Sequence, residues 1–183
     1  MPAFIAVFAI IIIIAILIII EQRKLVILDE NIINSMNQIG VQLSGRFDAL
    51  LSLLNLAKCY DGYESEKIIE MVKSRRSVIT AKSTPDDVID QEEVISEALC
   101  RIAMITRQYP ELKDNEIFIK TLDAVKIYEG MVRTSRLIYN DSVTRLNREI
   151  RIFPCSWIAG ILGFHRREYL AEREGKACIP IDK

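Results

Sequence analysis

The chain opens with an unbroken run of apolar residues. Residues 2–20, PAFIAVFAIIIIIAILIII, contain no charged and no hydrogen-bonding side chain. As a helix rising about 1.5 Å per residue, this run would span roughly 28 Å, close to the roughly 30 Å hydrocarbon core of a bilayer. A buried strand is the alternative, but strands are shorter, and in lipid only a helix satisfies its own backbone groups. We therefore expect a transmembrane anchor over residues 1–22, which contacts the lipid bilayer through residues 2–20.

The residues on either side of the run predict whether it is cleaved and how it is oriented in the membrane. No basic residue precedes it and no small-x-small site follows it, so we expect it to be retained rather than cleaved. Arg23 and Lys24 follow directly, which predicts a single-pass membrane protein with its N-terminus outside and its body in the cytoplasm. Free thiols would fit that reducing compartment, although four cysteines could also pair in three ways. The cysteines are Cys59, Cys100, Cys155 and Cys178, without CxxC or metal-ligand spacing.

Beyond the anchor, apolar residues recur at helical spacing, and no alternating strand pattern occurs. The first segment runs from Arg23 to Tyr60 as one amphipathic helix that continues out of the membrane, with Arg46 on its apolar seam. Gly40 and Gly45 are expected to be soft points within it. Asp61-Gly62 ends it by turn chemistry. Its apolar positions are Ile32, Met36, Ile39, Leu43, Leu50, Leu53, Ala57 and Tyr60.

Two shorter helical patterns follow. One covers residues 64–79. The other has a start signal, because Thr84 can cap a helix whose first position is Pro85, with two acidic residues at the positive end of the helix dipole. Tyr109-Pro110 ends it, since proline disfavours helical conformation in the residue before it. We expect the two pieces to stack end to end as one split rod.

The longest soluble pattern covers residues 115–153. Glu129 and Arg136 interrupt its apolar stripe, and we expect them to be paired inside the bundle, with Arg46 and Arg101 as candidate partners, since an unpaired buried charge is costly. The stripe comprises Phe118, Leu122, Val125, Val132, Tyr139, Val143, Leu146, Ile150 and Phe153.

Pro154 ends this rod, and residues 155–164 form a short apolar segment with Gly160 and Gly163. It could cap the bundle, lie at a membrane interface or dock elsewhere. Matching rod lengths favour three levels, up, down and up, which would place the segment far from the bilayer. The predicted fold is all-α: a transmembrane helix, then an elongated up-and-down antiparallel bundle of four helices over residues 23–165, and a flexible tail over residues 166–183.

Specific residues of the second half carry a resemblance to a known family. They are the Tyr109-Pro110-Glu111-Leu112-Lys113 box, Asn115-Glu116, Phe118, Glu129, Arg136, Tyr139-Asn140, Asn147, Phe153-Pro154, Ala159-Gly160 and Gly163-Phe164. Together they resemble the LemA family of single-span bacterial membrane proteins. Residues 39–43, Arg46, Asp48, Lys58 and Tyr60 are similar to the family's first helix, whereas Met36, Gly40, Gly45, Leu51, Cys59 and Tyr63-Glu64 depart from its pattern. The resemblance implies a bacterial cell membrane location and an inner helical bundle, without a settled activity.

Composition and motifs predict no chemistry. The net charge of −1, with 27% charged residues, does not favour nucleic-acid binding. No Gly-rich loop precedes a helix, and the one histidine, His165, cannot supply a di-iron site or a catalytic triad. Cys100 beside Arg101 is expected to pack in the core. We expect a protein that is not an enzyme, without cofactors and without catalytic, cofactor-binding or metal-ligating residues.

Two functions fit these patterns. The first is a membrane-anchored adaptor or scaffold that presents long helices to protein partners or to copies of itself. The second is a membrane-tethered sensor that binds a divalent cation or small ligand through acidic residues such as Glu64, Glu66 and Glu70, although a solvated helix face explains those residues as well.

Overall fold

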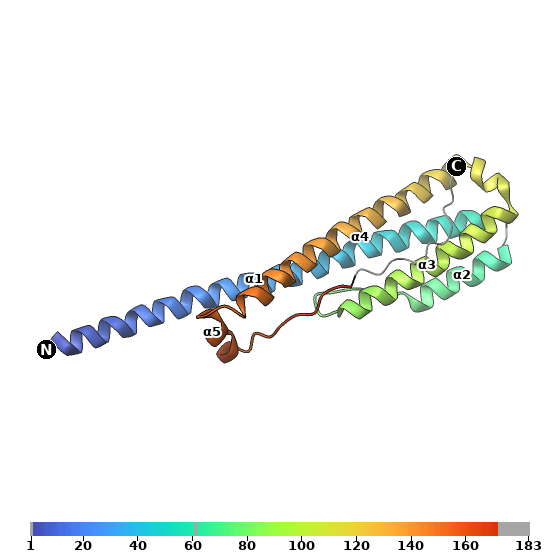
Figure 1. Cartoon of the computed structure of the whole chain (residues 1–183). Coiled ribbons are helices and arrows are strands. Elements are labelled where there is room, and N and C mark those ends of the chain that lie inside the picture. Colours follow the sequence, from blue (N-terminus) through green and yellow to red (C-terminus); the bar gives the residue numbers. More distant parts are fainter. Residues whose placement is uncertain (1, 61, 172–183) are drawn as a thin grey trace. The chain divides into compact units, whose positions relative to one another are not determined.

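The described part of the molecule is entirely helical. The computed structural model describes residues 2–60 and 62–171, without the side chains of residues 2, 3, 5 and 6. No strand occurs over these residues, so the predicted all-α class is confirmed. The elements are α1 (Pro2–Ala57), α2 (Gly62–Arg75), α3 (Pro85–Gln108), the 3₁₀ helix η1 (Pro110–Asp114), α4 (Glu116–Glu149) and α5 (Cys155–Leu162) (Figure 1).

The chain divides into two compact units. Unit 1 contains the chain up to Ser35 together with Ile138–Tyr169. Unit 2 contains Met36–Leu137 together with the chain from Leu170 on. Each unit therefore receives a part of α1 and a part of α4, and α2 and α3 belong to unit 2 alone.

The apolar seams of the two long helices form the core of these units. All the predicted seam residues of α1 are buried except Tyr60, which is half-buried, and Leu25, Phe47 and Leu54 join them. The α4 seam is buried from Phe118 to Leu146. Phe153 is 79% exposed, so its placement on the seam is wrong. The reason is that α4 ends at Glu149, four residues before the predicted end.

Helices α2 and α3 of unit 2 pack side by side, as Figure 1 shows, and not end to end. The predicted split rod is therefore wrong. The connection between them is held by Gln91, whose side chain accepts a hydrogen bond from Ser77 N at 2.7 Å and donates one to the Arg75 carbonyl at 3.1 Å. Ile79, which we placed on the second helix, lies in this connection and is buried.

Local sequence signals set the starts of α3 and α4 as expected. Thr84 Oγ1 accepts from Asp87 N, and the Asp87 carboxylate accepts from Thr84 N at 2.7 Å, which completes a capping box before Pro85. These bonds to the charged carboxylate lower the pKa of Asp87. At the start of α4, the Asn115 side chain accepts from the backbone N–H groups of Ile117 and Phe118.

Gly40 and Gly45 are points of close contact rather than soft points. A Cβ on Gly40 would lie 2.2 Å from the Ile79 carbonyl oxygen in the α2–α3 connection. A Cβ on Gly45 would lie 2.4 Å from the Tyr128 ring of α4. Helix α1 runs through both positions without a break. Space therefore favours glycine at both positions.

The sequence predicts a transmembrane anchor over residues 1–22. None of the helices, over the residues that the structure describes, combines the length and hydropathy of a membrane span.

Candidate functional site

A buried arginine and its partner form the first notable feature of unit 2. Arg46 Nη2 of α1 donates to Glu129 Oε2 of α4 at 2.7 Å, so the predicted pairing of Glu129 with Arg46 is confirmed. The two side chains differ in burial, 9% exposed for Arg46 and 60% for Glu129. Burial lowers the pKa of Arg46, while Glu129 and Glu92 act in the opposite direction. The guanidinium Nε is buried without a hydrogen-bond partner.

The second seam charge, Arg136, has a different partner from the expected ones. It forms an ion pair with Glu92 of α3 in which both side chains are largely buried. Arg101, the other candidate partner for the seam charges, instead bonds Glu97 one turn earlier on α3. That assignment is therefore wrong. The two seam charges thus serve to join α4 to α1 and to α3 within unit 2.

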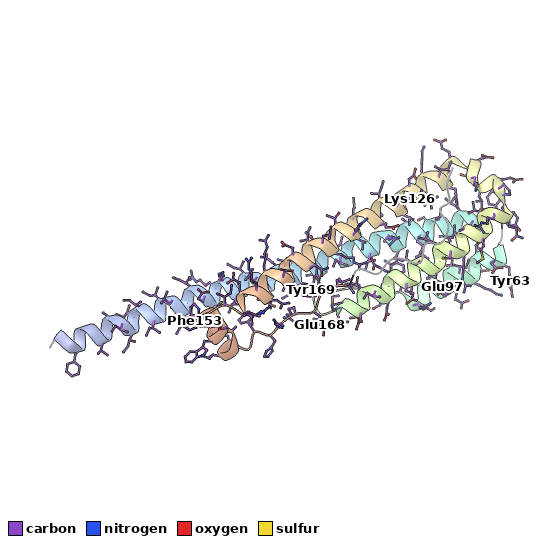
Figure 2. All side chains as sticks on the ribbon, in the orientation of Figure 1. Tyr63, Glu97, Lys126, Phe153, Glu168 and Tyr169 are labelled. Carbon is purple, nitrogen blue, oxygen red and sulfur yellow. The ribbon has the colours of Figure 1, made fainter. Side chains whose placement is uncertain are left out.

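The polar residues that carry the resemblance also hold the segment after α5. In unit 1, Asn147 donates to the Arg167 carbonyl at 2.9 Å and accepts from Arg167 N at 3.0 Å, and Tyr139 Oη donates to the Glu168 carbonyl. Burial raises the pKa of Tyr139. The Arg167 guanidinium bonds Asp29 of α1. Figure 2 shows Glu168 and Tyr169 on this extended segment.

In unit 2, the same kind of contact continues at the end of the described chain. Arg136 donates to the Ala171 carbonyl, and Leu170 is buried. Within residues 166–171, which we expected to belong to a flexible tail, the carbonyls of Arg167, Glu168 and Ala171 thus accept hydrogen bonds from α4. The rest of that predicted tail lies outside the described residues.

An open groove lies between α1 and α4 on the surface of unit 2. Gly45 and Tyr128 lie within it. Three apolar residues that line the groove are exposed: Val41 at 68%, Ile127 at 59% and Met131 at 45%. A cluster of exposed apolar side chains is typical of a protein or membrane contact.

Helix α5 forms a second exposed apolar feature, in unit 1. Its inner residues Cys155, Ile158 and Ala159 are buried. Burial, and after it the neighbouring Glu21 carboxylate, raises the pKa of the Cys155 thiol to about 11. Lys24 Nζ donates to Glu149 Oε2 at 2.7 Å. The segment 155–164 thus lies beside the end of the apolar run, and our prediction that it lies far from the anchor is wrong.

The residues that the sequence analysis considered for metal binding or catalysis are spread over the surface. Glu66 pairs with Lys58 at 2.8 Å, a bond that lowers the pKa of Glu66, and Glu70 is exposed. His165 is exposed in the segment after α5. Over the described residues, no three His, Cys, Asp or Glu side chains come together as a metal site would need. Cys59 and Cys155 carry free thiols, whereas Cys100 is disulfide-bonded.

These features define the chain as an all-helical bundle protein whose first helix begins with an exposed apolar run. The model of the LemA family matches residues 35–181. The chain belongs to the LemA family, as its residues suggested.

Curated relatives match a smaller part. Magnetosome protein MamQ 2 and magnetosome protein MamQ 1 of Paramagnetospirillum magneticum (strain ATCC 700264 / AMB-1) are each 30% identical to this chain over 76 residues. That match covers 42% of this chain and 28% of each relative. The chain thus spans under a third of the length of these relatives.

Proposed function

We propose that this chain is a membrane-anchored scaffold that catalyses no reaction and associates laterally with copies of itself. The observation that carries the proposal is the N-terminal half of α1. Every described side chain from Val7 to Ile20 is exposed, and all of them are apolar. In water this exposure would cost about 25 cal/mol per Å². Lipid removes that cost, and a helix leaves no backbone group unsatisfied there.

The LemA family resemblance and the similarity to the two MamQ proteins support a membrane-associated role in the bacterial cell membrane. We propose a single span with the N-terminus outside and the bundle in the cytoplasm. This orientation rests on Arg23 and Lys24, which follow the run directly. The cysteines do not bear on the orientation, because free thiols at Cys59 and Cys155 occur together with a disulfide at Cys100.

The groove between α1 and α4 is the surface that we assign to self-association. Its exposed apolar residues Val41, Ile127 and Met131 lie on both walls, so the face can meet its own copy about a two-fold axis. A membrane anchor restricts copies to one orientation in a thin layer, which raises their effective concentration.

A photocrosslinking experiment tests this association. A benzophenone amino acid replaces Ile127 in the full chain, which is expressed in its membrane and irradiated. We expect an adduct of twice the chain's mass. Met131→Asp should abolish this adduct, because a carboxylate would have to be desolvated in the contact. Val78→Asp is the control, since Val78 is also an exposed apolar residue, at 74%, but lies outside the groove in the α2–α3 connection.

The proposal fails if no adduct forms and the detergent-solubilised chain stays monomeric at every concentration. An adduct with a different protein, without the doubled species, would also contradict self-association.

A further inference from the structure

The exposed face of α5 and its neighbours is a continuous apolar stripe in unit 1. Phe153, Trp157 and Ile161 follow one another at a spacing of four residues and are 79%, 77% and 81% exposed. Figure 2 shows Phe153 at the junction of α4 and α5. Residues four apart lie on the same side of a helix. Trp157 and Ile161, both in α5, therefore point in one direction, away from the buried Cys155, Ile158 and Ala159, and Phe153 is exposed in the turn just before the helix.

The neighbours of the inner face of α5 show where along α1 the stripe lies. The Glu21 carboxylate, on the first charged residue after the apolar run, raises the pKa of the Cys155 thiol, so these two side chains are neighbours. Lys24 is tied to Glu149, six residues before Cys155 in the chain. If residues 2–20 occupy the hydrocarbon, Glu21 and Lys24 lie at its boundary. Helix α5 then lies at the height of the lipid headgroups.

The composition of the stripe matches that environment. Tryptophan is enriched where an apolar medium meets water, because its ring is apolar and its N–H is polar. Basic residues flank the stripe: Arg151 precedes it, and Arg166 follows it with His165, all three exposed. Cationic side chains next to an apolar face favour a surface that carries anionic headgroups.

Helix α5 ends at Leu162, and Gly163 is its C-cap residue. Gly163 adopts φ 78°, the left-handed conformation that residues with a Cβ disfavour, and Phe164 N donates to the Ala159 carbonyl at 3.0 Å. The chain leaves α5 at this point and returns along α4, where Asn147 bonds Arg167. Helix α5 is thus held at both ends, with its apolar stripe facing outwards.

We propose that the stripe Phe153, Trp157 and Ile161 lies in the headgroup region of the same membrane as a second, interfacial contact. The proposal rests on the anchor proposed above. The lipid surface therefore holds each chain in two places, once by the span and once by α5. Unit 1 can then neither rotate freely about the span nor swing away from the bilayer.

Trp157 reports on this contact directly, because it is the single tryptophan of the chain. The full chain is placed at one copy per nanodisc, in phosphatidylcholine and phosphatidylglycerol. We expect blue-shifted Trp157 emission, quenching by lipids brominated near the headgroup and weaker quenching by lipids brominated near the chain ends. Acrylamide in the water should quench poorly. Ile161→Asp should shift the emission to the red and restore acrylamide quenching, with unchanged helical circular dichroism.

Two readouts separate this proposal from the anchor. A chain that enters the nanodisc but shows water-exposed Trp157 would overturn the interfacial contact and leave the anchor intact. A chain that does not co-elute with the disc would overturn the anchor and the contact together. Shielding that appears only in crowded vesicles, and not at one copy per disc, would show that a second copy covers α5, which also contradicts the proposal.

Discussion

Replacing Gly40 by valine should lower the free energy of unfolding by about 3 kcal/mol, the upper end of overpacking costs. The added Cβ would lie 2.2 Å from the Ile79 carbonyl oxygen and 3.0 Å from its carbon. These are backbone atoms of the α2–α3 connection, which Gln91 holds in place by two hydrogen bonds. The connection cannot yield as a side chain could. Urea unfolding of the detergent-solubilised full chain, followed by helical circular dichroism, measures the loss.

Two other glycines provide matched controls. Gly130→Ala adds a Cβ inside α4 with no atom within 4 Å, so it should raise stability by about 0.5 to 1 kcal/mol through helix propensity. Gly45→Ala approaches the Tyr128 ring, which can turn aside, so its cost should lie between the two. Equal stability of the Gly40 and Gly130 variants would contradict the packing described for α1.

The pair of Arg46 and Glu129 should respond asymmetrically to mutation. Glu129→Ala leaves a guanidinium that is 9% exposed without its carboxylate, which should cost about 2 kcal/mol. Arg46→Met removes the buried charge and keeps most of the side-chain volume, so it should change stability by less than about 1 kcal/mol. Urea midpoints of the two single variants and the double variant measure the coupling.

The double variant should resemble Arg46→Met alone, because the carboxylate of Glu129 is mostly solvated once its partner is gone. Lys120→Ala is the control, since it breaks an exposed ion pair with Glu116 and should leave the midpoint unchanged. If Arg46→Met destabilised the chain more than Glu129→Ala does, the ion pair would contribute net stability. The attraction between Arg46 and Glu129 would then exceed the cost of burying the charge, contrary to our expectation.

Local chemistry made the helix ends predictable. Thr84, Pro85 and Asp87 identify the start of α3 because a cap needs only neighbours in sequence. The 4,3 spacing likewise identifies the seams of α1 and α4, and it places Arg46 and Glu129 on facing stripes. These residues could be matched in advance because opposite charges on apolar seams have few other ways to be satisfied.

The arrangement of the middle helices could not be predicted in the same way. Matching rod lengths assumed that Ile79 belonged to a helix, but α2 stops at Arg75 and Ile79 is buried in the connection. Burial of a loop residue produces the same apolar signal as one more helical turn. That error also placed α5 far from the anchor.

Other features depend on contacts between distant residues. Nothing near Gly40 in sequence indicates the Ile79 carbonyl that excludes a Cβ there. The contacts of residues 166–171 had a signal in the sequence that we missed. Arg136, Tyr139 and Asn147 are polar positions along α4 that need hydrogen-bond partners. The chain after α5 supplies a backbone carbonyl to each of them.

Protease digestion of membrane vesicles of known sidedness tests the central claim, that the apolar run holds the bundle at the inner face of the membrane. After digestion, the membranes are washed with alkaline carbonate and the pellet is probed for the chain. We predict full-length protein in the pellet from right-side-out vesicles, a short anchor fragment from inverted ones, and no retention of a chain that lacks residues 2–20. Release of the full chain by carbonate, or digestion of the bundle in right-side-out vesicles, would contradict the account.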